Sequence, residues 1–201
     1  MNRATMFARL YRIASLAALA FVAACSNAPA EIPPLYDSAV VGGFELQDAQ
    51  GQTVSSEDFA GRYQMVYFGY AYCPDICPFD MAKMVRGLES FEEANPEFAG
   101  QIQPIFITID PARDTPEVIA EWTSGFSEDL IGLTGSPEAI AAAAGNYFVQ
   151  YSQQEPNARG DYLMDHTRLG YLVDREGQPM ALLPVDQSPE AVAAELEKWV
   201  R

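Results

Sequence analysis

Residues 64–78, QMVYFGYAYCPDICP, decide the fold of this chain. The first seven of them form an apolar and aromatic run without polar alternation, which is typical of a strand buried on both faces. Cys73 and Cys77 follow at once, and Pro78 predicts the first residue of a helix, where its missing N–H costs nothing. The sequence therefore predicts two thiols at the junction between a buried strand and the helix that follows it.

The rest of the chain alternates between strand and helix patterns. The sequence predicts strands at residues 64–70, 102–109 and 130–133, helices at 78–91, 115–126, 136–147 and 188–200, and hairpins at 44–54 and 169–183. Strand–helix–strand units of this kind give an α/β fold, here a central mixed sheet flanked by helices, with an N-terminal β-hairpin.

The first 24 residues have the pattern of an export signal. Arg3, Arg9 and Arg12 precede a short apolar run that ends in Val-Ala-Ala before Cys25. This run is shorter than the roughly 18 residues expected of a membrane span. It resembles the lipobox of bacterial lipoproteins, which implies that Cys25 is lipidated and that the peptide before it is removed. We therefore expect a signal peptide at 1–24, a Pro-rich lipid-anchored linker at 25–40 and a folded domain at 41–201, facing the periplasm of a bacterial cell envelope.

The charge balance excludes one class of partner. Twelve basic and 28 acidic residues give a formal net charge of −16, and loss of the three leader arginines would lower it to −19. Such a surface repels nucleic acid and anionic lipid. We expect no nucleic-acid partner, and membrane contact only through the lipid anchor.

Cys73, Cys77 and His166, the only histidine, are the residues with metal-binding or redox chemistry. Two thiolates and an imidazole suit a soft metal ion. The same two cysteines are a dithiol that can cycle to a Cys73–Cys77 disulfide, the expected state in an oxidising compartment without a reductant or metal. Cys77, next to Pro78, lies near the expected helix N-terminus, and such a position lowers the pKa of a thiol. The residues alone leave both interpretations open.

Three segments in order resemble the Sco/SenC family of copper-binding assembly factors. They are YFGYAYCPDICP at 67–78, ITIDPARDTP at 107–116, and DHT at 165–167 followed by YLVD at 171–174. The similarity covers nearly all of residues 41–201. It implies a thioredoxin-like fold, in which two cysteines stand between the first central strand and its helix.

The resemblance also implies a function. Copper, as Cu(I) or Cu(II), would be held by Cys73, Cys77 and His166, and the protein would help to mature the dinuclear copper site of cytochrome c oxidase. Its partners would be the oxidase subunit that carries this site, a copper donor and a thiol reductant. Such a protein is a metallochaperone rather than an enzyme.

Two carboxylates are candidates for a supporting role. Asp165 is adjacent to His166 and could orient its imidazole, as carboxylates behind metal ligands do. Asp110 ends a predicted strand near the cysteine loop. Capping or local ion pairing explains Asp110 more simply. A solvated loop aspartate explains Asp165 equally well.

Other functions remain as alternatives. A thiol-disulfide oxidoreductase could reduce cysteines of exported copper proteins, but such proteins carry a proline near the position of Arg168, and none occurs between Pro156 and Pro179. A peroxiredoxin-type peroxidase expects threonine where Tyr70 stands. A structural zinc site would need a fourth, closing ligand.

Overall fold

The structure is a computed structural model that describes residues 31–201, and residues Pro33–Arg201 form one compact unit. The predicted signal peptide and Cys25 lie outside the described residues. None of the helices within residues 31–201 combines the length and the apolar character needed to cross a membrane.

A five-stranded mixed sheet forms the centre of the unit. Its strand order is β5-β4-β3-β8-β9, in which β3 is parallel to β4 and antiparallel to β8. The strands are β3 (Tyr63–Gly69), β4 (Ile102–Thr108), β5 (Ile131–Leu133), β8 (Gly170–Val173) and β9 (Pro179–Leu183). All residues of β3 and β4 are buried, as their continuous apolar sequences predict.

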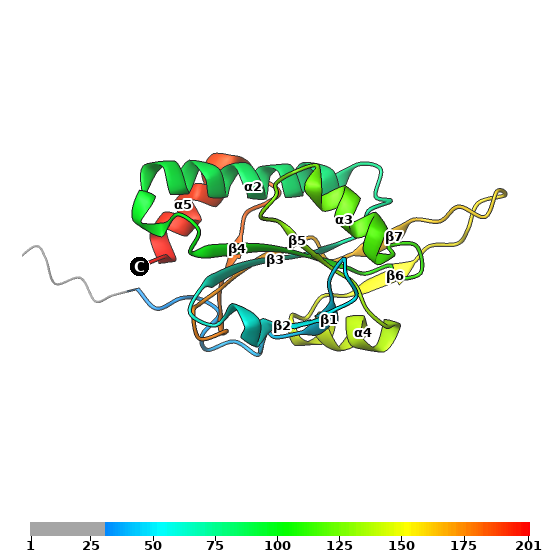
Figure 1. Ribbon diagram of the computed structural model, residues 1–201, viewed down its shortest axis with the longest axis horizontal. Helices are drawn as coiled ribbons and strands as arrows, with labels where there is room; N and C mark the ends of the chain where they lie inside the picture. The colour runs from blue at the N-terminus through cyan, green and yellow to red at the C-terminus, as the bar shows by residue number, and fades with distance from the viewer. Residues whose placement is uncertain (1–30) are drawn as a thin grey trace, which may run out of the picture. The chain divides into compact units, whose positions relative to one another are not determined.

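Helices cover both faces of this sheet (Figure 1). Three of them, α2 (Ile76–Ala94), α3 (Pro116–Ser124) and α5 (Pro189–Trp199), lie on one face, and α4 (Pro137–Asn146) lies on the other. Neighbouring residues of β3 contact the helices on opposite faces of the sheet, because side chains alternate along a strand. Tyr67 bonds to α2 through Asp80, whereas the ring of Phe68 packs against Tyr147 at the end of α4.

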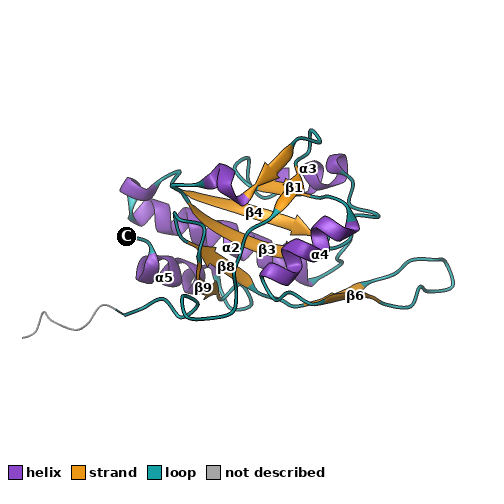
Figure 2. Cartoon of the chain, turned by 90° about the horizontal axis from the view of Figure 1, so that it is seen from below, coloured by secondary structure: helices purple, strands orange, loops and turns teal. Residues whose placement is uncertain are grey.

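Two small sheets complete the fold. The predicted N-terminal hairpin is present as β1 (Glu45–Gln47) and β2 (Thr53–Ser55), on the same face as α4 (Figure 2). A second pair, β6 (Tyr151–Gln153) and β7 (Met164–His166), was not predicted. Its three-residue strands are too short and too polar to show an apolar period. Within residues 31–201, short 3-10 turns at Ser56–Phe59 and Pro96–Phe98 are the remaining elements.

The expected mixed sheet flanked by helices, with its N-terminal hairpin, is therefore confirmed. The predicted start of the helix after the cysteines is wrong, because α2 begins at Ile76 and Pro78 is its third residue. Residues 33–40, assigned above to the linker, are part of the compact unit: the Leu35 amide donates to the Met180 carbonyl, and the Tyr36 hydroxyl donates to Asp174.

Candidate metal centre

The cysteine loop connects the end of β3 to the first turn of α2. Cys73 is half-buried in the loop, and Cys77 is buried as the second residue of the helix. Both are free thiols. The backbone amide of Cys77 lies 3.4 Å from the Cys73 sulfur. The first N–H groups of a helix have no partner within the helix. Since the Asp75 side chain makes no cap bond, the Cys73 sulfur takes that place, and the helix begins two residues before Pro78.

The two thiols titrate very differently. Hydrogen bonding from the Cys77 side chain, together with the amides of Cys77 and Asp75, lowers the pKa of Cys73 to about 5. Hydrogen bonding to Cys73 and burial raise the pKa of Cys77 above its ordinary value, so the lowering expected from the helix N-terminus is wrong for this residue. At neutral pH the pair therefore holds one thiolate, on the more exposed Cys73, and one buried thiol.

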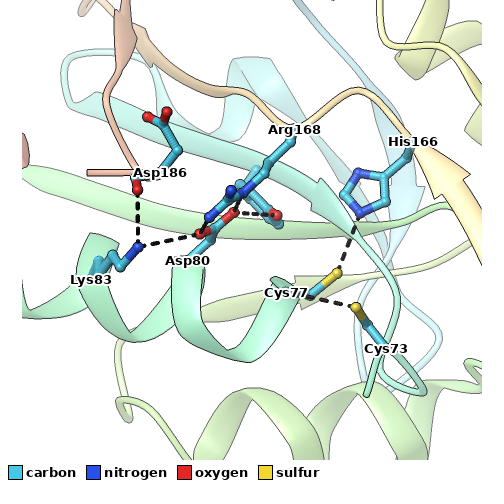
Figure 3. Close-up of polar contacts among 8 residues, drawn as sticks. Cys73, Cys77, Asp80, Lys83, His166, Arg168 and Asp186 are labelled. Carbon is cyan, nitrogen blue, oxygen red and sulfur yellow. Dashed lines mark hydrogen bonds and ion pairs between the residues drawn. The ribbon is translucent and has the colours of Figure 1, made fainter. Parts of the chain in front are cut away.

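His166 reaches this loop from a different part of the chain. It is the last residue of β7, paired with Tyr151 of β6, and its Nε2 lies 3.4 Å from the Cys77 sulfur (Figure 3). Metal–sulfur and metal–nitrogen bonds of about 2.0–2.3 Å separate two ligands of one ion by roughly 3.5 Å. The separation between Nε2 and the Cys77 sulfur is therefore suitable for two ligands of a single ion.

The other imidazole nitrogen fixes the tautomer. His166 Nδ1 lies 3.0 Å from the carbonyl oxygen of Thr167. A carbonyl oxygen only accepts, so Nδ1 carries a proton, and Nε2 is the nitrogen that faces the Cys77 sulfur. The predicted partner of the imidazole, Asp165, is not the group that lies against Nδ1. Its side chain is exposed on the other side of β7 and accepts from Gln154.

Aromatic rings pack around the imidazole. The rings of Tyr67 and Tyr70 stand edge-on to His166, with centroids 6.2 and 6.3 Å away. Tyr67 is completely buried and Tyr70 nearly so. Rings at this distance limit how far the imidazole can turn and reduce its contact with water.

Asp110 belongs to a cluster beside the loop. Its two carboxylate oxygens accept from Arg113 Nε at 2.5 Å and from the Tyr162 hydroxyl at 2.9 Å. The Arg113 guanidinium stacks on the Tyr162 ring at 3.6 Å and lies 5.2 Å from the Tyr72 ring. Asp110 therefore joins the hairpin that carries His166 to the cysteine loop, and makes no contact with the sulfurs.

Two buried aspartates, Asp114 and Asp80, lie near the site, and sequence reasoning missed the second of them. Asp114 is completely buried and accepts from the Ala71 amide at 2.9 Å and the Thr108 hydroxyl at 2.6 Å, which ties the cysteine loop to the end of β4. Asp80, also completely buried, pairs with Arg168. Asp80 occupies a core position in the helical pattern, where an acidic residue is unusual, and this could have indicated that it has a buried partner.

The site is not fully assembled. Within residues 31–201, no group of three or more histidine, cysteine, aspartate or glutamate side chains is arranged as a finished metal site. Cys77 and His166 are at ligand spacing, whereas the Cys73 sulfur is turned toward the Cys77 amide. The structure thus brings all three predicted residues together.

Residues 33–201 match the sequence profile of the SCO1/SenC family. The chain belongs to this family. A SCO2-like protein of Rickettsia felis is 35% identical over 162 residues, which cover 78% of this chain and 75% of that protein. The human mitochondrial SCO1 homolog is 32% identical over 160 residues, which cover 80% of this chain and 52% of that protein.

Solved Sco structures confirm the thioredoxin-like fold. The structure of Bradyrhizobium japonicum ScoI with copper bound is 35% identical, with a TM-score of 0.68, and the match covers 81% of this chain and all of that chain. Arabidopsis thaliana ScoI, also with copper bound, is 32% identical, with a TM-score of 0.72 over 80% of this chain and 97% of that chain. The chain spans about half the length of the yeast, mouse and human relatives it matches.

Proposed function

We propose that this SCO1/SenC protein is a copper metallochaperone that helps to assemble the dinuclear copper site of cytochrome c oxidase. The observation that carries the proposal is the 3.4 Å approach of His166 Nε2 to the Cys77 sulfur, with the Cys73 sulfur beside the Cys77 amide. Membership of a family whose solved relatives hold copper supports it.

Each ligand would play a distinct part. Cys73 is half-buried and ionised at neutral pH, so it would meet an incoming cuprous ion first. Cys77 would then lose its proton, and His166 would add Nε2 without losing one. Three ligands leave a coordination position open, which suits transfer to a partner by ligand exchange.

Acid should weaken this binding. A thiolate must form at each cysteine before it can bind a metal ion, so protons compete with copper. Below the pKa of about 5 at Cys73, both sulfurs are protonated. We expect the affinity for copper(I) to fall steeply as the pH is lowered from 7 to 5. An unchanged affinity over this range would contradict the ligand set.

The test of the proposal is a copper(I) titration of the reduced protein against a chromogenic chelator, wild type beside His166→Ala. Loss of one of three ligands should weaken binding at least tenfold. The stoichiometry should stay at one ion per chain. Equal affinities would exclude His166 as a ligand and with it the proposed centre.

A thiol-disulfide oxidoreductase is the second candidate, favoured by the low pKa of Cys73. It would act on cysteines of exported copper proteins. His166→Ala separates the two functions, because a reductase that uses only the cysteine pair keeps its turnover. The predicted Cys73–Cys77 disulfide belongs to both functions and can be followed by thiol counting under air and after reduction.

We also propose that the chain is lipid-anchored through Cys25 and faces the periplasm, with residues 1–24 removed. Replacement of Cys25 by serine should abolish metabolic labelling with a fatty acid and leave the precursor uncleaved. Labelling that survives the replacement would refute the anchor.

A further inference from the structure

Asp80 lies one helical turn after Cys77 on α2 and is completely buried. Arg168 lies two residues after His166, in the connection between β7 and β8. Arg168 donates from Nε and Nη2 to the two carboxylate oxygens of Asp80, and the Tyr67 hydroxyl adds a third bond at 3.1 Å. The ion pair thus joins the helix that carries Cys77 to the segment that carries His166.

The position of His166 needs such a connection. Its strand, β7, bonds only to β6 in a separate two-stranded sheet, and the described part of the chain shows no ladder from that pair to the central sheet. The backbone therefore does not fix the distance from the imidazole to α2. Figure 3 shows Arg168 and His166 descending from the same segment, one to Asp80 and the other to Cys77.

We propose that Asp80 and Arg168 are positioning residues, whose ion pair holds the His166 segment against α2 and so keeps Nε2 at the Cys77 sulfur. The inference rests on the proposed copper site and adds to it. A two-point bond from a planar guanidinium fixes both distance and orientation, which a single point charge does not.

A purely structural role makes a different prediction. Asp80 is completely buried, whereas 36% of the Arg168 side chain is exposed. The pair contributes little net stability, because solvent screens the exposed arginine and desolvation of the buried carboxylate offsets the attraction. If stability were the only role, leucines at both positions would leave the copper site unchanged. If the pair positions His166, the same change leaves the fold intact and loosens the site.

The test uses the full chain carrying Asp80→Leu and Arg168→Leu together, which removes both charges of the pair. This change also takes the partner from the buried Tyr67 hydroxyl, so Tyr67→Phe alone is a control that should leave the histidine contacts and the copper affinity unchanged. His166 is the only histidine, so ring labelling gives one set of NMR signals. In the wild type, nuclear Overhauser contacts should connect this ring to Tyr67 and Tyr70. The double variant should unfold cooperatively, lose these contacts and bind copper(I) roughly tenfold more weakly.

Two further controls make the result specific. Arg175→Leu removes an arginine that packs over the Tyr63 ring at the opposite end of β3, and it should change neither the histidine contacts nor the copper affinity. In a His166→Ala background the double leucine variant should weaken copper binding by less than twofold, because the residue it positions is gone. A full tenfold further loss would overturn the proposal.

Arg168→Lys keeps the charge, and it provides the test if the double variant does not fold. It should fold, because Asp80 keeps a cation nearby, and it should lose part of the histidine contacts together with the bidentate bond. Wild-type contacts and affinity in either variant would overturn the positioning role. If His166→Ala itself leaves copper binding unchanged, the proposed function fails, and the NMR contacts alone then decide whether the pair positions the ring.

Discussion

The reactivity of Cys73 is the most direct consequence of the site at the scale of single residues. Its pKa of about 5 makes it a thiolate at pH 7, whereas the pKa of Cys77 is raised. Because alkylation requires the thiolate, iodoacetamide should modify Cys73 first, with a rate that rises with pH to a plateau above about pH 6. Mass spectrometry of peptides from the reduced protein, quenched at intervals, measures this. Faster modification of Cys77 at pH 6 would contradict the assignment.

The same shift predicts how stability depends on pH. The pKa of Cys73 in the folded chain lies below its ordinary value of 9.0, so the folded state holds fewer protons between about pH 5 and 9. The contribution of Cys73 to stability is therefore complete above pH 9 and is lost as the pH falls through about 5. Solvent screening reduces it, since the thiol is only half-buried. The melting temperature of the reduced wild type should rise more between pH 6 and 8 than that of Cys73→Ser, and parallel curves would refute this.

At the scale of secondary-structure elements, α4 ends with a strained residue. Phe148 follows the helix with φ of 56°, and Val149 donates back to Ala144 at 2.8 Å, as in a Schellman ending that usually contains glycine. The left-handed conformation costs a non-glycine residue about 1–2 kcal/mol, and the greater unfolded-state freedom of glycine offsets part of that.

Phe148→Gly should therefore stabilise the protein by about 0.5–1 kcal/mol. The side chain is mostly exposed, so its removal costs little packing. Phe148→Ala retains the strained backbone and should give no such gain. Urea unfolding of both variants measures the difference, and an equal effect of alanine and glycine would show that the backbone is not strained.

The contact between α2 and α5 depends on Gly87. A Cβ added there would lie 2.6 Å from Val192 Cβ and 2.8 Å from the carbonyl oxygen of Pro189. Gly87→Ala should destabilise the protein by about 1–2 kcal/mol, because overpacking exceeds the gain of up to about 1 kcal/mol in helix propensity. Gly145→Ala in α4, with open space around the added methyl, is the matched control and should be neutral or stabilising. Stabilisation by Gly87→Ala would show that the helices can separate cheaply.

At the scale of the whole molecule, α5 completes the core. Val192, Leu196, Trp199 and Val200 are buried, and the Tyr63 hydroxyl bonds to the carbonyl of Arg201. Burial of each large apolar side chain stabilises by roughly 1.5–3 kcal/mol, so their sum approaches the 5–15 kcal/mol of a whole domain.

Deletion of residues 189–201 should therefore abolish cooperative unfolding, as measured by near-ultraviolet circular dichroism during heating. Deletion of residues 1–32, outside the compact unit, should leave the transition in place. A sharp transition in the C-terminal deletion would show that the sheet and the other helices are sufficient.

The sequence by itself determined the central sheet, its helices and the identity of the cysteine site. Continuous apolar runs mark β3 and β4 because those strands are buried on both faces, and proline after serine or threonine marks the starts of α3, α4 and α5. Cys73, Cys77 and His166 could be proposed as metal ligands because thiols and imidazoles bind soft metal ions and are rare in this chain.

Only the tertiary structure decided how His166 reaches Cys77 and what holds it there. The hairpin of β6 and β7 is short and polar, so no periodicity predicts it. Asp80 and Arg168 are far apart in the sequence, and their pairing exists only because the fold buries one beside the other. Local patterns report burial along an element, whereas the spacing of an imidazole and a thiol depends on contacts between elements, which no local pattern contains.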